Sequence, residues 1–389
     1  MIDTNKNVVT SDSSTSAETA QTCQHAVSPF LANPRECHGY PPSYVKNEPK
    51  NELNFFLTNH SDQIQQDEGA KKKRGGIFKM MPACNLRKKG KTKKCVETQN
   101  KCVETERSLA CSLVSREEIS FEQLENQVSS SSKENFITKP VIIICHGAMS
   151  WRNQMLLINL SSELFTCLDA NILRFDFTGN GQSEGEWAMC NFNEEYEDLL
   201  TVIDFVTNSL GCQVGCVIGH SKGTASVLSY ASHVAKQELE DGKDVICKCF
   251  VNLAGRYRVP GIHDPLRKFG EEQRKEMLEK GFFEVKSAWG DGRVFKVTKE
   301  DLDAHKFQSV ADTPKVLVHL KKDSSVRVLT IHGDDDEVVP VQDAFRFNEE
   351  IVNHSLHVIK QANHNFNGIK HIDEMVSQIA TFYNSVYNS

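Results

Sequence analysis

Val214–Gly223 reads Val-Gly-Cys-Val-Ile-Gly-His-Ser-Lys-Gly, and this stretch decides how the rest of the chain is interpreted. The apolar run Val214–Ile218 leads directly into Gly219-His220-Ser221-Lys222-Gly223, and the helical pattern Ala225–Val234 follows. A strand, a Gly-x-Ser-x-Gly turn and a helix in this order are typical of a nucleophile elbow. The turn is so tight that residues two before and two after the serine must be small, as Gly219 and Gly223 are. Ser221 is therefore the candidate nucleophile.

Other apolar runs resemble strands buried on both faces, as in a parallel sheet. They lie at residues 140–145, 172–176, 249–253, 326–331 and 356–359. Patterns at near-helical spacing, at residues 151–168 and 196–206, fall between them. Strand, helix, strand in alternation predicts an α/β fold with a mostly parallel central sheet flanked by helices. The active residues of such a fold lie in loops at the carboxyl ends of its strands.

Two regions depart from this alternation of strands and helices. Residues 256–323 are polar and helix-prone, and we interpret them as a helical lid inserted over the strand ends. Residues 1–135 are rich in Ser, Thr, Asn, Gln and Lys without a sustained apolar period, and the mean hydropathy of the chain is low, at -0.43. We predict a low-complexity, largely disordered N-terminal region at 1–135, followed by one domain at 136–389.

The N-terminal region contains a concentrated basic block. Residues 71–94 hold eleven Lys or Arg and no acid, although the whole chain of 389 residues has a net charge of -7. Such a block could contact nucleic acid, an anionic membrane or a nuclear import receptor. A solvated charge run is the simpler interpretation, and we favour it.

The remaining composition narrows the class of protein. No apolar stretch is long enough to span a membrane, and the first 30 residues lack a secretory pattern. The 13 cysteines do not show paired C-x-x-C spacing, so we expect reduced thiols and no metal site. Gly179–Gly185 has the spacing G-x-G-x-x-x-G, which does not fit a dinucleotide fingerprint. We therefore expect a cytoplasmic protein, or a nuclear one if the basic block acts as a nuclear localisation signal. We also expect that the protein has no cofactor.

A serine hydroxyl needs a histidine to take its proton, and the histidine needs a carboxylate to hold its tautomer. On this kind of fold the chain order is Ser, acid, His. Four acids, Asp334–Glu337, follow the predicted strand at 326–331, and chemistry alone does not rank them. His364 directly follows the last predicted strand, whereas His332, His354 and His357 lie in or beside strands. His364 is thus the candidate base.

Acyl transfer also needs two N–H donors for the oxyanion. One is expected to be the backbone N–H of Lys222, which follows the nucleophile at the start of a helix. The other is expected from the loop His146–Ser150, after the first strand of the domain.

Five motifs in order resemble the serine aminopeptidase-like or cinnamoyl-esterase-like branch of the α/β-hydrolase superfamily. They are His146-Gly147-Ala148, Arg174–Gly185, Gly219–Gly223, Val328–Gly333 with Asp336–Pro340, and His364–Phe366. The resemblance spans residues 140–387. It implies that Asp336 is the acid, that His364 is the base, and that the donor after Gly147 is the N–H of Ala148.

The resemblance implies a serine hydrolase acting on a small-molecule ester or acyl substrate. Relatives with short lids are mostly carboxylesterases, so we expect a carboxylic ester hydrolase of the carboxylesterase or lipase kind. Aminopeptidase-like amide cleavage and acyl-thioester cleavage are the alternatives. A further alternative, of another class, is a binding protein that uses the same fold without catalysis.

Overall fold

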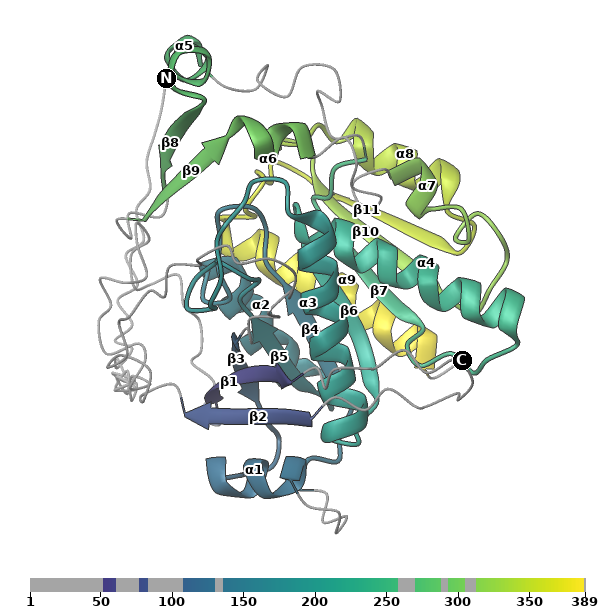
Figure 1. The fold of residues 1–389 in the computed structure, drawn as a ribbon. Coiled ribbons are helices and arrows are strands. Elements are labelled where there is room, and N and C mark those ends of the chain that lie inside the picture. Colours follow the sequence, from purple (N-terminus) through teal and green to yellow (C-terminus); the bar gives the residue numbers. More distant parts are fainter. Residues whose placement is uncertain are drawn as a thin grey trace, which may run out of the picture.

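The computed structural model describes residues 52–60, 77–82, 108–129, 136–257, 270–287, 293–304 and 313–387. Nine strands form one sheet in the order β11-β10-β7-β6-β4-β5-β3-β1-β2 (Figure 1). The strands are β1 Glu52–His60, β2 Ile77–Pro82, β3 Ser108–Val114, β4 Val141–Cys145, β5 Asn171–Phe175, β6 Val214–His220, β7 Cys249–Leu253, β10 Arg327–Gly333 and β11 His354–Ile359.

Six consecutive strands of this sheet, β11-β10-β7-β6-β4-β5, are parallel to one another, which confirms the predicted α/β class. The strands β4, β5, β6 and β7 are buried along their whole length. Their near-continuous apolar sequences fit a sheet that is covered on both faces.

Helices cover the two faces of the sheet. On one face, α3 Phe192–Asp204, the π-helical turn η4 Phe205–Ser209 and α4 Gly223–Asp241 pack together with α8 Gln342–Glu350. On the other face lie α2 Met155–Cys167 and α9 Ile369–Tyr387. The apolar core therefore has two parts, one on each side of the sheet, and the catalytic candidates lie in loops at the strand ends between them.

The sheet extends further towards the N-terminus than the sequence predicts. The strands β1, β2 and β3 pair antiparallel with their neighbours and continue the sheet beyond β5, and α1 Phe121–Ser129 follows β3. Phe55 and Leu57 in β1 and Leu113 in β3 are buried. The predicted boundary between a separate region at 1–135 and a domain at 136–389 is thus wrong, because burial of these side chains makes β1–β3 part of the domain.

Much of the basic block at 71–94 lies outside the described residues. Of this block, residues 77–82 are described and form β2, the strand at the edge of the sheet. The expectation of disorder for residues 1–51, 61–76, 83–107 and 130–135 also falls outside the described residues.

The insertion predicted at 256–323 contains helices and, in addition, a β hairpin. Its described elements are α5 Glu271–Lys280, β8 Phe282–Lys286, β9 Val294–Thr298, α6 Lys299–Ala304 and α7 Thr313–Val316. The strands β8 and β9 pair antiparallel in a small sheet of their own. Figure 1 shows α5, β8 and β9 at the end of the molecule opposite β1 and β2.

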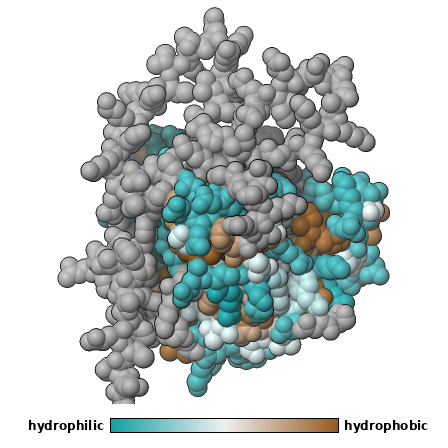
Figure 2. All heavy atoms as spheres, turned by 90° about the horizontal axis from the view of Figure 1, so that it is seen from below, coloured by the Kyte–Doolittle hydropathy of each residue, from teal (hydrophilic) through white to brown (hydrophobic). Residues whose placement is uncertain are grey.

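One face of the molecule exposes mostly hydrophilic side chains among the described residues (Figure 2). Figure 2 shows the underside of Figure 1, where teal side chains predominate between the grey atoms and the brown patches are small. Among the helices of the described segments, none is long and apolar enough to cross a membrane.

Candidate active site

Ser221 lies at the sharp turn between β6 and α4. Its backbone has φ +52°, a left-handed conformation that non-glycine residues rarely adopt and that costs about 1–3 kcal/mol. A Cβ at Gly219 would approach backbone atoms of Thr224 to 2.8 Å, and one at Gly223 would lie 2.4 Å from the His146 carbonyl oxygen. Both glycines are therefore required by close backbone approach, as the sequence predicts.

The three predicted side chains of the candidate triad meet at this turn. His364 Nε2 lies 2.9 Å from Ser221 Oγ, and His364 Nδ1 lies 2.8 Å from Asp336 Oδ2. Ser221 follows β6, Asp336 follows β10 and His364 follows β11, so the topology of the sheet brings together residues more than 140 positions apart. The arrangement allows the proton of the serine hydroxyl to pass to a histidine whose orientation a carboxylate fixes.

The contacts of Asp336 distinguish it from the other three acids of its loop. Asp336 Oδ1 accepts the backbone N–H groups of Val338 and Val339, at 2.8 and 2.7 Å, and its side chain is 0% exposed. Asp334, Asp335 and Glu337 are exposed. The structure therefore places the residue that the resemblance selects, and none of its neighbours, against the Nδ1 atom of His364.

His332 is a second partner of Asp336, and sequence reasoning did not assign it to the site. Its Nε2 lies 3.2 Å from Asp336 Oδ2 and 2.9 Å from the Val339 carbonyl oxygen. Burial alone would raise the pKa of Asp336, but hydrogen bonds from His332 and His364 hold the pKa of this carboxyl well below its usual range. The position of His332 in a strand, four residues before the acid, is the signal that could have found it.

Two further histidines near Ser221 are buried and neutral. Burial, and after it the charge of nearby His364, lowers the pKa of His220 to about 3. Its Nε2 donates to the His364 carbonyl oxygen at 2.9 Å. Burial likewise lowers the pKa of His146 to about 4, and this ring accepts the Phe177 N–H at Nε2 and donates to the Gly147 carbonyl at Nδ1. Both rings hold loop backbone in place next to the candidate nucleophile.

The loop His146–Ser150 lies beside the elbow. A Cβ at Gly147 would be 3.0 Å from Ser221 Cβ, so this glycine allows the loop to approach the nucleophile closely. Ala148 is exposed, and Met149 has φ +52°. Lys222 caps the N-terminus of α4, where backbone N–H groups have no carbonyl partner within the helix. The roles of Ala148 and Lys222 as oxyanion donors remain predictions.

The side chain of Lys222 has a separate role. Its Nζ donates to Asn191 Oδ1 and Glu195 Oε1, both at 2.6 Å, and this ion pair is almost fully buried. Burial raises the pKa of Glu195, while the charge of Lys222 opposes that rise. The pair therefore ties the start of α3 to the nucleophile elbow.

The insertion contacts the same region. Asp301 of α6 accepts the backbone N–H groups of Met189 and Cys190, at 2.5 and 2.7 Å. A buried apolar cluster joins the insertion to the segment before α3, with the members Met189, Cys190, Phe192, Met277, Phe283, Val297 and Leu302, and Met149 and Ala225 pack against it. Ala225 lies in the first turn of α4, so the insertion packs close to the elbow.

In the described segments no group of three or more His, Cys, Asp or Glu side chains is arranged to hold a metal ion. The eight cysteines described there are free, and seven of them are buried. The expectation that the reaction needs no cofactor stays a prediction.

The model of the alpha/beta hydrolase family matches residues 142–377, which is more than half of the chain. The chain belongs to the alpha/beta hydrolase family. Membership supports hydrolase activity. The expected superfamily is thereby confirmed.

Relatives of this α/β hydrolase include the mouse protein palmitoyl-protein thioesterase ABHD10, mitochondrial. The two sequences are 25% identical over 251 residues, which is 62% of this chain and 77% of the mouse protein. A crystal structure from Agrobacterium vitis S4, described as that of a candidate hydrolase, superposes with a TM-score of 0.51 at 20% identity, and covers 72% of this chain and 94% of the other. This similarity supports the fold.

A further solved structure is Est1E from Butyrivibrio proteoclasticus with ferulic acid bound. It superposes with a TM-score of 0.49 at 19% identity, and covers 73% of this chain and 97% of the other.

Proposed function

We propose that this α/β hydrolase is a serine hydrolase that cleaves carboxylic esters through an acyl-enzyme. The observation that carries the proposal is the series Ser221–His364–Asp336, with hydrogen bonds of 2.9 and 2.8 Å. A serine hydroxyl, an imidazole and a buried carboxylate joined by hydrogen bonds in this order form the arrangement that activates the serine of a serine hydrolase.

In the first half of the reaction, Ser221 Oγ attacks the ester carbonyl carbon and His364 Nε2 takes the hydroxyl proton. Asp336 stabilises the resulting imidazolium and keeps Nδ1 protonated. The backbone N–H groups of Ala148 and Lys222 donate to the oxyanion, where loss of one such donor costs about 2.7–4 kcal/mol. The tetrahedral intermediate then expels the alcohol, which takes the proton from His364.

In the second half, His364 removes a proton from water and the resulting hydroxide attacks the acyl carbon. Collapse of the second intermediate releases the carboxylic acid and returns the proton to Ser221. No step needs a metal ion or an organic cofactor.

The experiment that tests this proposal is a panel of p-nitrophenyl esters of increasing acyl length with wild-type protein and Ser221→Ala. We expect wild type to release p-nitrophenol and Ser221→Ala to lose at least about 10³-fold in kcat, because the nucleophile is missing. Equal turnover by folded wild type and Ser221→Ala would contradict the proposal.

Thioester hydrolysis is the second candidate function, and one comparison favours it. The mouse relative carries the name palmitoyl-protein thioesterase, and the same acyl-enzyme mechanism cleaves thioesters. Acyl-thiocholine substrates beside the matching esters would separate the two, since a thioesterase has the higher kcat/KM on the thioester. Amide cleavage is tested by aminoacyl anilides in the same panel.

A non-catalytic binding protein is the alternative from another class. The intact series of three side chains favours an enzyme over such a role.

We also propose a cytoplasmic location, although the name of the mouse relative includes the word mitochondrial. Fractionation of cells that express the full chain tests the location directly.

A further inference from the structure

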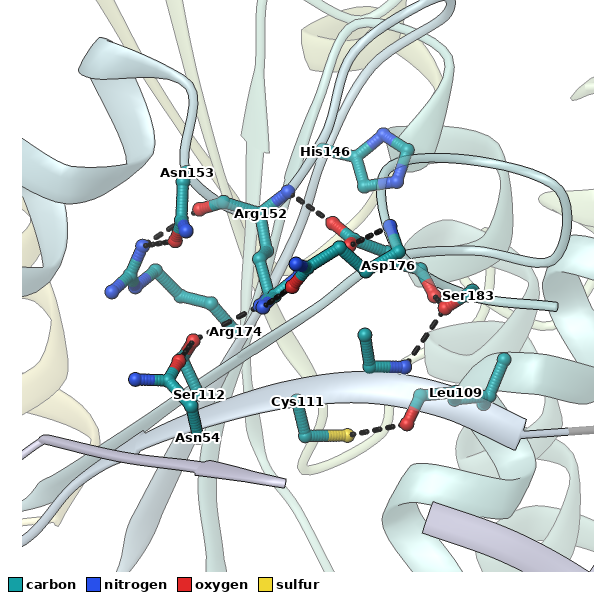
Figure 3. A network of polar contacts seen from close by, with 12 residues as sticks. Asn54, Leu109, Cys111, Ser112, His146, Arg152, Asn153, Arg174, Asp176 and Ser183 are labelled. Carbon is teal, nitrogen blue, oxygen red and sulfur yellow. Dashed lines mark hydrogen bonds and ion pairs between the residues drawn. The ribbon is translucent and has the colours of Figure 1, made fainter. Parts of the chain in front are cut away.

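Three buried charged side chains and a fourth that is partly buried lie behind the loop that carries Ala148. They are Arg152, Arg174, Asp176 and Glu52, whose side chains are 1%, 1%, 0% and 11% exposed. Arg152 pairs with Asp176, and Arg174 pairs with Glu52 at 2.9 Å. Figure 3 shows the Arg152 side chain pointing towards Asp176, and the Arg174 guanidinium pointing towards Asn153 and the backbone of Arg152. The two guanidinium groups and two carboxylates together carry no net charge.

These side chains hold the backbone of Arg152 on both sides (Figure 3). The N–H of Arg152 donates to Asp176 Oδ1 at 2.6 Å, and its carbonyl oxygen accepts Arg174 Nη1 at 2.7 Å. The same Nη1 atom also donates to Asn153 Oδ1 at 3.0 Å. Arg152 follows Ala148 by four residues, so a fixed peptide at Arg152 restricts the conformations open to the loop.

The loop is also tied to the segment that carries His364. Ser150 Oγ donates to Gln154 Oε1 at 2.7 Å, and Gln154 Nε2 donates to Asn365 Oδ1 at 3.1 Å. Met149, with φ +52°, directly precedes Ser150. A backbone conformation of this kind persists only where the surrounding contacts determine it.

The strand β1 contributes two members of the network from far away in the sequence. Glu52 Oε2 accepts Arg174 Nη2, and Asn54 Oδ1 accepts the hydroxyl of Ser112, whose oxygen in turn accepts Arg152 Nε at 3.0 Å. Without the carboxylate of Glu52, two buried guanidinium groups would share one carboxylate. An unpaired buried charge is strongly unfavourable, so Arg174 would be expected to move towards water and release the Arg152 carbonyl.

We propose that Glu52 is a positioning residue for acyl transfer, which acts through Arg174 and the Arg152 peptide to hold the Ala148 N–H in its oxyanion-binding place. This inference rests on the proposed function. It assigns a role in the reaction to a strand that lies outside the matched residues 142–377 of the family model. Because Glu52 acts through Arg174, its effect is on the transition state and not on substrate binding.

The experiment compares full-length wild type, Glu52→Gln and the control Glu117→Gln. Glu117 is a half-buried carboxylate that accepts hydrogen bonds from Thr138 and Ser115, away from the loop. Two quantities are measured: kcat and KM on the best p-nitrophenyl ester of the panel, and amide hydrogen exchange of peptides covering residues 146–154 and 214–220. For Glu52→Gln we expect kcat to fall about tenfold, with KM within about twofold, and faster exchange in 146–154 alone. Glu117→Gln is expected to match wild type in both.

A folded Glu52→Gln variant with wild-type kcat, or with lower kcat and unchanged exchange in 146–154, would overturn the inference. If Glu52→Gln does not fold, Arg174→Lys keeps the positive charge but loses the forked contacts to Glu52 and to the Arg152 carbonyl, and wild-type values of kcat and loop exchange for Arg174→Lys would overturn it equally. If wild type itself hydrolyses no ester, the proposed function fails. If wild type is active and Glu52→Gln is equally active, the positioning role alone fails.

Discussion

Ser221 and Asp336 show how single residues are prepared for the proposed chemistry. Ser221 adopts φ +52° at a turn closed by Gly219 and Gly223, which exposes its hydroxyl to His364. Asp336 uses one oxygen for two backbone N–H groups and the other for His332 and His364. Each partner fixes the carboxylate in the position that the histidine needs, before any substrate binds.

Asp336→Asn is expected to lower kcat by about 10³- to 10⁴-fold, because an amide that donates towards Nδ1 favours the wrong tautomer of His364. Asp335→Asn is the matched control on an exposed neighbour and is expected to keep most of the activity. Steady-state kinetics on the same ester measure both. Equal damage from the two substitutions would show that the acid is assigned wrongly.

His332→Phe removes one of the two imidazole contacts of the Asp336 carboxylate while it keeps a ring of similar size. We expect the pKa of Asp336 to rise and kcat to fall about tenfold, since the carboxylate loses a charge-stabilising hydrogen bond. The measurement is steady-state kcat on the same ester for wild type and His332→Phe. A variant with unchanged kcat would show that the His332 contact has no role in catalysis.

The strands β4–β11 of the main sheet were predictable because each is a short, continuous apolar run between helical patterns. The strands β1–β3 were not predictable in the same way. The sequence of β3 mixes Ser108, Ser112 and Cys111 with apolar residues, and its neighbours β1 and β5 are 48 and 57 residues away in the chain, counted between strand ends and starts. Long-range antiparallel pairing leaves no local signal, so the composition around these strands dominated the interpretation.

The candidate site, like the sheet, could be predicted from the sequence only in part. The order Ser221, Asp336, His364 follows from motifs in loops after strands, and the structure brings these residues together. Glu52, Arg152 and His332 carry no such motif, because their place in the site depends on which strands become neighbours. The hairpin β8–β9 was missed although its strands are rich in Phe and Val, because the polar, helix-prone residues before it, such as Glu271–Met277, dominated the interpretation.

Deletion of residues 1–107 is expected to destabilise the whole domain, whereas deletion of residues 1–51 removes no described element. Loss of β1 uncovers Leu109, Cys111 and Leu113 of β3 and leaves that strand as an unpaired edge. Thermal unfolding and soluble yield of the two truncated proteins measure the effect. Equal melting temperatures for the two would contradict the extension of the core into β1.

The whole molecule should lose stability as the pH falls from about 6.5 towards 4. In the folded state burial lowers the pKa of His146 to about 4 and that of His220 to about 3, so these rings stay neutral while their unfolded counterparts take up protons. More protons bound to the unfolded chain means a smaller free energy of unfolding, by up to about 1.4 kcal/mol per histidine for each pH unit.

Urea unfolding at pH 7.5, 6 and 5 measures this dependence. His220→Gln keeps a donor for the His364 carbonyl and cannot titrate, so the loss between pH 7.5 and 5 is expected to be smaller than in wild type. Glu117→Gln serves as the control that leaves the histidines in place. The same loss in wild type and His220→Gln would show that buried histidine is not its source.

The central claim is that Ser221 is a nucleophile activated by His364, and covalent labelling tests it most directly. Full-length protein is treated with a fluorophosphonate, and intact mass and peptide mapping locate the adduct. We expect a single adduct on Ser221 in wild type, none in Ser221→Ala, and labelling at least about 10³-fold slower in His364→Ala. Folded wild-type protein that takes up no label, or takes it up on another residue, would contradict the account.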